Sequence, residues 1–390
     1  MIHSYAQKIR RQLHQYPELG FDLERTLTLL KNELASLGVP YTEKYGKSSL
    51  VATIIPKNYN GVTIGIRADM DAIPVQELND VPYKSKIDGQ MHACGHDVHT
   101  AVVLTTLKEL NERKNELHCQ VKFIFQASEE KFPCGGFFMV QDGVMEDIDF
   151  IVSLHCSPSN PVGKVGINEG VNCANIHDFD LKFIGKSSHV AKQHKGIDAI
   201  SMAVQAYQAI ELMIAKRLPE KERVAFNVGK INGGTASNVI ASDCTMRCTL
   251  RTLSNDVDEF LMTHIKEICQ RIAGEMGGQF EYVELENRPL FSGDDTVTNQ
   301  MRQSAQKVVG EENVFDKEAT LGGEDFAYYA KEKPACMFYL GVNNLEKGII
   351  SPVHSGTFDV DENALDIGVK VFTQFVFDAM NGLNFKKEGK

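Results

Sequence analysis

The sequence contains no apolar run that approaches the roughly 18–20 residues needed for a membrane helix. Its first 15 residues, MIHSYAQKIRRQLHQ, are charged and polar, whereas a secretory signal has an unbroken apolar stretch there. An excess of positive charge is also lacking, because 41 Lys and Arg face 52 Asp and Glu, for a formal net charge of −11. This balance argues against a nucleic acid or an anionic membrane surface as a partner. We therefore expect a cytoplasmic protein with no membrane or nucleic-acid partner.

A disulfide framework and a glycine-rich phosphate loop are also missing. The nine cysteines are an odd number without regular close spacing, which is typical of buried thiols in a reducing compartment. The chain has no internal repeat and no low-complexity tract. Its 390 residues exceed one ordinary core, and its hydrophobic content of 43% is that of a globular protein. Two domains are therefore expected, while composition leaves the chemistry open.

Hydrophobic spacing predicts an α/β arrangement for the first part of the chain. Residues 4–37 have helical periodicity, with a break at Pro17 and a stop at Gly38. Short apolar runs rich in β-branched and aromatic residues follow, separated by helical stretches such as 101–110. The runs are 50–55, 62–66, 121–125, 150–154 and, much later, 337–340. Continuous apolar runs are typical of strands buried on both faces of a sheet that is covered by helices.

The middle of the chain has a different pattern, which predicts the order β-α-β-β-α-β of a ferredoxin-like domain. The expected elements are a strand at 178–184, a helix at 198–216, strands at 224–228 and 244–250, a helix from the cap Ser254 to about Gly274, and a strand at 280–283. The α/β pattern resumes after about Arg288. We therefore predict that residues 178–288 are inserted between two parts of a catalytic domain, 1–177 and 289–390.

Polar side chains follow the predicted buried strands. Asp69 and Asp71 follow the run at 62–66, Glu129 and Glu130 follow the run at 121–125, and the run at 150–154 ends at His155. In open α/β sheets, ligands bind outside the carboxyl ends of the strands. We therefore expect these acidic and imidazole side chains to converge at one edge of the sheet.

The densest group of metal-binding residue types is HACGHDVH at 92–99, in a loop that opens a predicted helix. Three imidazoles, a thiol and a carboxylate within eight residues favour a metal site. Taken singly, Cys94 is also explained as a packed thiol, His155 as a hydrogen-bonded core histidine, and the pair Glu129 and Glu130 as a solvated surface. A structural zinc site would be closed and rich in thiolates, so the neighbouring carboxylates favour a catalytic site.

Seven motifs show a resemblance that extends from the first helix to near the end of the chain. They are RQLHQYPEL at 11–19, RADMDAIP at 67–74, MHACGHDVH at 91–99, QASEE at 126–130, SLH at 153–155, GGEDFA at 322–327 and the segment at His354. The chain resembles the aminoacylase and carboxypeptidase family of cocatalytic metallohydrolases, in particular the branch of hippurate hydrolases and plant indole-acetyl-amino-acid hydrolases. This resemblance implies a zinc-exopeptidase-like α/β fold, with a mixed, mainly parallel sheet flanked by helices and an inserted ferredoxin-like lid or dimerisation domain.

The resemblance also implies a role for individual residues. It implies two divalent metal ions per subunit, manganese or zinc with cobalt as a further candidate, and the ligands Cys94, His96, Glu130, His155 and His354. Glu129 resembles the general base. His189 in GKSSH at 185–189 resembles a histidine that stabilises the developing oxyanion, often from a neighbouring subunit. Asn238 in GGTASNVI at 233–240 and Arg251 resemble residues that hold the substrate carboxylate, although Arg251 is also explained as a solvent-facing strand residue.

The implied activity is hydrolysis of the amide bond of N-acyl amino acids to a carboxylic acid and a free amino acid. The alternative is a dipeptidase or carboxypeptidase with the same two-metal centre. A non-catalytic binding protein would have lost the base or the ligands, and all are present here. The resemblance further implies a homodimer or homotetramer assembled through the inserted domain.

Three segments depart from the family pattern. Ala241 stands where proline is usual, Gln193 stands near a usual proline, and KFPC at 131–134 interrupts a usual glycine-rich stretch. These changes leave the implied ligands intact and flank the parts that would contact the acyl group and the carboxylate of a substrate. They therefore leave the substrate preference open.

Overall fold

The computed structural model describes residues 2–384, and the chain divides into two compact units. The first unit contains the chain up to Asn172, the segment Ser292–Glu318 and the chain from Asp325 onward. The second unit contains Cys173–Phe291 and the short segment Ala319–Glu324. Each unit has its own hydrophobic core. The sequence-based division at 178 and 288 leaves Ala319–Glu324 out of the second unit, because so short a segment has no periodicity to interpret.

The first unit contains an eight-stranded mixed sheet in the order β1-β2-β4-β3-β5-β14-β6-β13. Its strands are β1 (Tyr41–Thr42), β2 (Leu50–Ile54), β3 (Thr63–Asp69), β4 (Gln120–Gln126), β5 (Phe150–Pro161), β6 (Val165–Ile167), β13 (Val314–Asp316) and β14 (Ala335–Asn343). The pairs β4–β3, β3–β5 and β5–β14 are parallel, whereas the pairs β1–β2, β2–β4 and β14–β6 are antiparallel. Strands β3 and β4 are buried at every position, which explains their nearly continuous apolar sequences.

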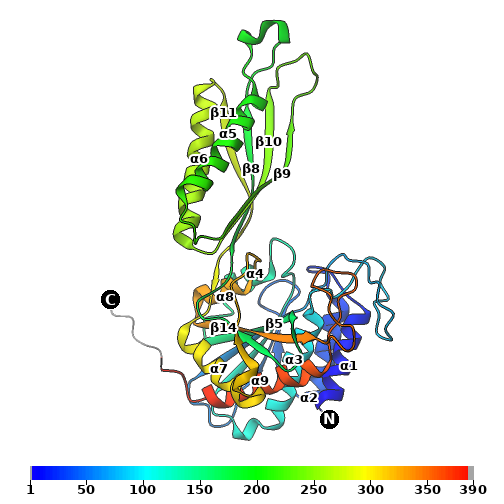
Figure 1. Cartoon of the computed structure of the whole chain (residues 1–390). Helices are drawn as coiled ribbons and strands as arrows, with labels where there is room; N and C mark the ends of the chain where they lie inside the picture. Colours follow the sequence, from blue (N-terminus) through cyan, green and yellow to red (C-terminus); the bar gives the residue numbers. More distant parts are fainter. Residues whose placement is uncertain (1, 385–390) are drawn as a thin grey trace. The chain divides into compact units, whose positions relative to one another are not determined.

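Helices flank this sheet (Figure 1). They are α1 (Ile2–Gln15), α2 (Glu24–Leu37), α3 (His96–Glu112), α4 (Gly135–Gln141), α7 (Asp295–Val309), α8 (Phe326–Glu332) and α9 (Asn363–Ala379), with short 3-10 turns at Lys114–Glu116 and Glu311–Asn313. Helices α1, α3, α9 and α7 pack in a row, each against the next, while α4 and α8 contact each other and strands β4, β5 and β14. Helix α2 ends at the predicted Gly38, which adopts the left-handed conformation (φ +65°) that glycine tolerates without strain.

The second unit is a four-stranded antiparallel sheet with two long helices. Its elements are β8 (Asn175–Ile184), the 3-10 turn Val190–Lys195, α5 (Ala199–Arg217), β9 (Val224–Gly233), β10 (Asp243–Thr252), α6 (Asn255–Glu275) and β11 (Gln279–Arg288), and the strand order is β11-β8-β10-β9. Residues of β10 alternate between buried and accessible, and the buried set includes Met246 and Leu250. The hydroxyl of Ser254 caps α6 by accepting from the N–H of Val257, as the sequence predicts. The predicted α/β fold with a ferredoxin-like β-α-β-β-α-β segment is thus confirmed.

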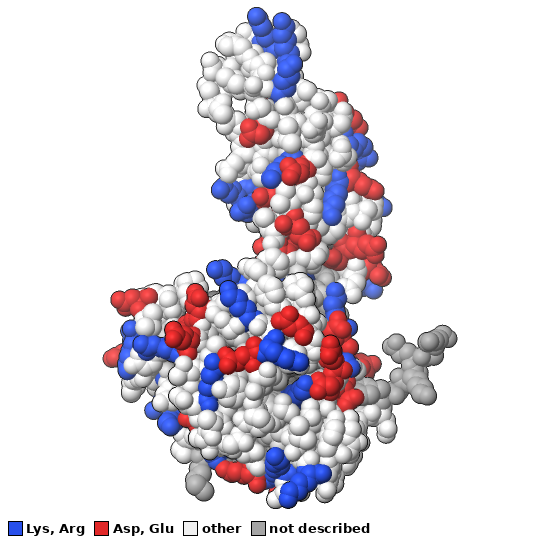
Figure 2. Space-filling model, turned by 180° about the vertical axis from the view of Figure 1, so that it is seen from behind, with Lys and Arg blue, Asp and Glu red and all other residues white. Residues whose placement is uncertain are grey.

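Two short strands, β7 (Val171–Cys173) and β12 (Phe291–Ser292), lie at points where the chain passes between the units. None of the helices among residues 2–384 combines the length and the apolar character needed to cross a membrane. On the face of the molecule shown in Figure 2, acidic and basic side chains are interspersed.

The position of His155 differs from the prediction that its strand ends there. Strand β5 continues through His155 to Pro161, because β14 runs parallel to it and provides backbone partners beyond that point. On the other side, the pairing of β5 with β3 stops at Ser153. His155 therefore lies inside β5 but beyond the last residue that pairs with β3. Cys156 and Ser157 after it are buried again, so the polar residue after the apolar run marked neither the end of the strand nor the end of burial.

Candidate metal centre

The loop that precedes α3 presents Cys94 and His96 on either side of a glycine. Gly95 has φ +87°, and a Cβ at this position would lie 2.8 Å from the Sγ of Cys156. Both the backbone conformation and the close approach therefore require glycine. The C-terminal loop joins this segment through the N–H of His354, which donates to the carbonyl of Ala93 over 2.7 Å. Residues about 260 positions apart in the sequence are thereby brought together.

All five predicted metal ligands converge at this point. The Sγ of Cys94 lies 3.6 Å from Nε2 of His155, and Oε1 of Glu130 lies 3.2 Å from Nε2 of His354 and 3.8 Å from Nε2 of His96. Potential ligand atoms of Cys94, His96 and His155 all lie within 4.8 Å of one another, and so do those of Cys94, Glu130 and His354. Cys94 belongs to both groups. A third group of this kind contains His96, Glu130 and the predicted base Glu129.

The hydrogen bonds of these side chains fit metal ligation. His155 donates from Nδ1 to the carbonyl of Cys156 over 2.8 Å, which leaves the Nε2 lone pair facing Cys94. His96 is almost completely buried, and neither of its ring nitrogens has a hydrogen-bond partner among the described residues. Imidazole, thiolate and carboxylate are the ligands that zinc and other transition metals use, so the residues present fit the metal ions that the resemblance implies.

The protonation states within the cluster depend on burial and on neighbouring charge. Burial raises the pKa of the Cys94 thiol well above its usual value, and Glu130 raises it further. Burial also raises the pKa of Glu130, but His354 and His96 lower it by more, to about 2. Burial lowers the pKa of His96, whereas Asp69 and Asp71 raise it by more, so it stands well above its usual value. A cation bound here would keep the carboxylate of Glu130 deprotonated and would favour the thiolate form of Cys94.

Asp71 positions the two glutamates. Its Oδ1 and Oδ2 accept from the backbone N–H groups of Glu129 and Glu130 over 2.9 and 3.1 Å, and Oδ1 lies 3.4 Å from Nδ1 of His96. Because both hydrogen bonds are made just past the end of β4, they set the direction in which Glu129 and Glu130 leave the strand. The sequence predicted that Asp71 lies at the carboxyl edge of the sheet, but it did not indicate that Asp71 positions the two glutamates. The only local indication was that Asp71 lies two residues after the end of β3.

His99 is not available as a ligand, although it belongs to the same motif. Its Nδ1 donates to Oδ1 of Asp69 over 2.6 Å, and its Nε2 accepts from the N–H of Cys156 over 2.9 Å. Burial lowers the pKa of His99 to about 4 despite the neighbouring Asp69. Asp69 in turn accepts from Nη1 of Arg67, whose Nη2 donates to Asp325 over 2.6 Å. His99 thus holds β5 next to β3, and through it the ligand His155.

The remaining polar residues of segment 92–99 face a second buried group of charges. Oδ2 of Asp97 accepts from Nε of Arg10 and lies 2.8 Å from Nδ1 of His14. The guanidinium of Arg10 is fully buried and also lies 3.1 Å from Asp359 and 3.4 Å from Glu362. We call Arg10, His14, Asp97, Asp359 and Glu362 the anchor cluster. It joins α1 to the segments that carry His96 and His354.

The side chains of segment 92–99 therefore face different surroundings. Cys94 and His96 face the candidate centre, Asp97 belongs to the anchor cluster, and His99 is held by backbone and carboxylate. His92 is buried near the anchor cluster, with its ring centroid 6.4 Å from that of His14, and burial lowers its pKa to about 3. Consecutive residues of a helix point about 100° apart. A dense motif at a helix start therefore divides its side chains among different surroundings.

Three predicted residues lie in the second unit. His189 and Asn238 are exposed and belong to adjacent segments, because the N–H of Val190 donates to the carbonyl of Asn238 over 3.0 Å. Arg251 is half-buried in β10, and its Nη1 donates to the carbonyl of Leu321 over 3.0 Å. Their contacts with a substrate stay predictions.

Residues 65–378 match the peptidase family M20/M25/M40. The chain belongs to this family. It is 32% identical over 364 residues to a putative amidohydrolase of Bacillus subtilis, with 93% of this chain and 92% of that protein covered. It is 33% identical to thermostable carboxypeptidase 2 of Saccharolobus solfataricus, with 94% and 93% covered. It is also 31% identical to an N-acetylcysteine deacetylase of B. subtilis, with 96% of each chain covered.

A solved M20 structure has the same fold over nearly the whole chain. It is the YXEP protein of B. subtilis, described as a dinuclear metal-binding peptidase of the M20 family, with a TM-score of 0.84, 29% identity, and 97% of this chain and 99% of that chain covered. The predicted resemblance is therefore confirmed, and so is the prediction of a hydrolase of the amidohydrolase and aminoacylase type.

Proposed function

We propose that this M20 chain hydrolyses the amide bond of N-acyl amino acids and releases a carboxylic acid and a free amino acid. The proposed ligands of two divalent ions are Cys94, His96, Glu130, His155 and His354. The observation that carries the proposal is the convergence of these five side chains, from four separate segments, beside Glu129, with Cys94 and His96 buried and His354 exposed. The N-acyl amino acid deacetylase among the relatives supports this substrate class.

The surrounding residues would perform the proton transfers. Bound divalent ions supply Lewis acidity and lower the pKa of water toward neutrality. Glu129 is almost completely buried and is held by the bond from its N–H to Asp71, next to Glu130. Its carboxylate would accept a proton from the attacking water and then deliver it to the leaving nitrogen. In this proposal His189 donates to the developing oxyanion, and Asn238 and Arg251 hold the substrate carboxylate.

The ligand set suggests which ions to test first. A thiolate prefers softer ions such as zinc, whereas a carboxylate also suits manganese, so zinc, manganese and cobalt all remain candidates. Peptide cleavage by the same centre, as a dipeptidase or carboxypeptidase, is the alternative, and the carboxypeptidase among the relatives favours testing it.

We further propose a homodimer or homotetramer that forms through the second unit. Strand β9 is an edge of its sheet, and its far half is exposed. On α5 the apolar side chains of Ile200, Val204 and Tyr207 recur at helical spacing and are 40%, 46% and 38% exposed. Open strand edges and exposed apolar side chains are both features that proteins usually cover. The cytoplasmic location stays a prediction from the sequence.

Elemental analysis joined to a substrate panel tests the proposed function. Purified protein is analysed for bound metal and reloaded with zinc, manganese or cobalt. It is then assayed with acetyl-, benzoyl- and indole-acetyl-amino acids beside dipeptides, and the same panel is repeated after chelation. We expect close to two ions per subunit and hydrolysis of N-acyl amino acids that chelation abolishes. Faster cleavage of dipeptides would favour the alternative, and hydrolysis that survives complete metal removal would overturn the proposal.

A further inference from the structure

The ring nitrogen Nε2 of His96 lies between two carboxylates. Oε1 of Glu130, a candidate ligand, is 3.8 Å away, and Oδ2 of Asp69, which is outside the proposed ligand set, is 3.7 Å away. Both distances exceed that of a hydrogen bond. The other ring nitrogen, Nδ1, faces Asp71 at 3.4 Å. Nε2 is therefore the nitrogen that an ion held by Glu130 would bind, and Asp69 competes with that ion for it.

A hydrogen bond between Nε2 of His96 and Asp69 would oppose metal binding. A histidine that binds a metal ion through Nε2 uses the lone pair of this nitrogen, whereas donation to a carboxylate requires a proton on it. A shift of about 1 Å would bring the two atoms to the 2.7–2.9 Å of a charge-assisted hydrogen bond. Whatever restrains the carboxyl group of Asp69 therefore decides whether Nε2 stays available to an ion.

Arg67 restrains Asp69 at this distance. Nη1 of Arg67 donates to Oδ2 of Asp69 over 2.7 Å, and Nδ1 of His99 donates to the other oxygen over 2.6 Å. The side chains of Arg67 and Asp69 are completely buried, so the solvent screens this ion pair little. Both residues belong to β3, in which side chains two positions apart point to the same face of the sheet. The strand thus places the cation beside the carboxylate that it restrains.

The guanidinium of Arg67 is itself fixed from two other directions. Its Nη2 donates to Oδ1 of Asp325 over 2.6 Å, and its Nε donates to Oε1 of Gln126 over 3.0 Å. Oδ2 of Asp325 in turn accepts from Nε2 of Gln126 over 2.6 Å and from the N–H of Gly136 over 2.8 Å. A planar guanidinium offers its donors in fixed directions. Arg67 therefore cannot turn away from Asp69 without weakening its bonds to Asp325 and Gln126.

We infer that Arg67 is a positioning residue of the candidate metal centre, because by restraining Asp69 it leaves Nε2 of His96 free to bind a metal ion. This inference rests on the ligand role that the proposed function gives to His96. Arg67 acts through Asp69 rather than on the ion itself. If Arg67 only stabilised the fold, a second change at Asp69 would not repair the loss of Arg67, whereas a positioning role predicts such a repair.

The test measures zinc affinity by competition with a chromogenic chelator in the wild type, in Arg67→Gln and in Arg67→Gln combined with Asp69→Asn. Arg67→Gln frees Asp69 to accept from Nε2 of His96, so zinc affinity should fall by about 10–100-fold. In the double variant a neutral amide replaces the competing carboxylate and attracts Nε2–H less, so affinity should recover by about tenfold. Unchanged affinity in Arg67→Gln, or a double variant that binds zinc no more tightly, would overturn the inference.

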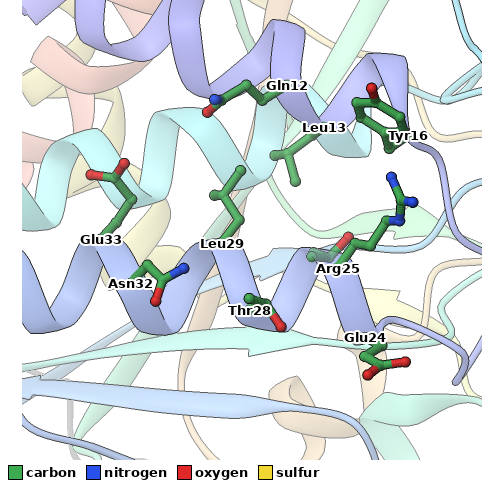
Figure 3. A pocket seen from close by; sticks show the side chains of 10 residues that line it. Gln12, Leu13, Tyr16, Glu24, Arg25, Thr28, Leu29, Asn32 and Glu33 are labelled. Carbon is green, nitrogen blue, oxygen red and sulfur yellow. The ribbon is translucent and has the colours of Figure 1, made fainter.

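Two control variants separate metal affinity from stability. Arg25→Gln makes the same exchange at the start of α2, in a surface cavity of about 620 Å³ that is lined by residues such as Tyr16 and Leu29 and by no candidate ligand (Figure 3). It should leave zinc affinity unchanged. Leu34→Ala removes a completely buried core side chain, so it should destabilise the fold and still leave zinc affinity unchanged. If Leu34→Ala weakens zinc binding as much as Arg67→Gln does, loss of packing explains both results and the inference fails.

Arg67→Lys replaces Arg67→Gln in the same test if the latter does not fold. Lysine retains the positive charge but has a single ammonium for acceptors that lie in three directions, so it restrains Asp69 less firmly. Zinc affinity should then fall by about threefold or more and recover when Asp69→Asn is added. No loss in Arg67→Lys, or a loss that Asp69→Asn does not relieve, would contradict the positioning role.

The zinc titrations do not depend on hydrolysis, so the two proposals fail separately. If no N-acyl amino acid is hydrolysed while zinc affinity falls in Arg67→Gln and recovers in the double variant, the proposed function fails and the positioning role is supported. If hydrolysis occurs and zinc affinity is the same in the wild type and Arg67→Gln, the proposed function is supported and the positioning role fails.

Discussion

The anchor cluster and the candidate metal centre receive side chains from consecutive residues of α3, Asp97 and His96, yet they balance charge in different ways. In the anchor cluster the carboxylates of Asp97, Asp359 and Glu362 face the fully buried guanidinium of Arg10. In the metal centre the carboxylate of Glu130 faces the imidazoles of His96 and His354 and belongs to a group with the thiol of Cys94. Buried anions require a nearby cation. In the anchor cluster this cation is Arg10, which belongs to the chain. The candidate metal centre has the form of a site that binds a cation from solution.

The largest expected effect is on kcat, and it tests whether the candidate metal centre is catalytic or only structural. In Glu129→Gln the side chain can no longer accept a proton, so kcat should fall by about 10²–10⁴-fold while the bound metal stays constant. Turnover and elemental analysis are measured on the same preparation. Glu116→Gln, which changes an exposed partner of Arg113, is the control and should leave both quantities unchanged. Unchanged turnover in Glu129→Gln would exclude it as the base.

A charge change in the anchor cluster tests whether that cluster also shapes the metal centre. Arg10→Gln leaves buried carboxylates without their cation, which should lower the free energy of unfolding by about 3–5 kcal/mol. Because Arg10 joins the segments that carry His96 and His354, metal affinity should also fall by about 10–100-fold. Denaturant unfolding and metal titration provide the two measurements.

Arg113→Gln is the matched control for this change. Arg113 pairs with the exposed Glu116, where an ion pair contributes about 0–1 kcal/mol, and its replacement should leave metal affinity unaltered. If Arg10→Gln destabilises the fold but binds both ions as tightly as the wild type, the two clusters are independent.

A smaller effect concerns the kind of cation that the metal centre prefers. Cys94→Ser replaces a thiolate by a hydroxyl, so zinc affinity should fall more than manganese affinity, by a further factor of about ten or 1.4 kcal/mol. Competition titrations with a chromogenic chelator measure both ions. Cys119→Ser, at a buried thiol outside the predicted ligand set, is the control. Equal losses for zinc and manganese would show that Cys94 only packs.

The smallest effect is a pH dependence of stability in the metal-free protein. Burial raises the pKa of Asp97, but Arg10 and His14 lower it by more and hold it well below its usual value. A carboxylate with a lowered pKa stabilises the fold above its unfolded value of about 3.9, and this stabilisation is lost as the pH falls below that value. Asp97→Asn should therefore lose stability less steeply than the wild type between pH 4 and pH 3, by up to about 1.4 kcal/mol per pH unit. Parallel slopes in urea unfolding would contradict this assignment.

The sequence predicted the elements of this protein well where periodicity was strong. The strands at 62–66 and 121–125 and the helices at 198–216 and 254–274 are all present, because burial on one or both faces leaves a regular apolar pattern. Weak or short features were not predicted. The extension of β5 past His155 depends on hydrogen bonds to β14, a strand almost 180 residues later, and no local pattern records that pairing.

For the candidate site, the sequence alone showed which residue types are present and that they follow buried strands. It also predicted that they converge, because the carboxyl ends of parallel strands lie at one edge of a sheet. It also determined that Gly95 separates Cys94 from His96. Only the tertiary structure decided that neighbours in one motif divide between two clusters, that both nitrogens of His99 are occupied, and that Phe132 lines a cavity beside Glu130. The physical reason is that a side chain's partners depend on which distant segments pack against it, and contacts such as that of His354 with Ala93 join residues with no local relation in sequence.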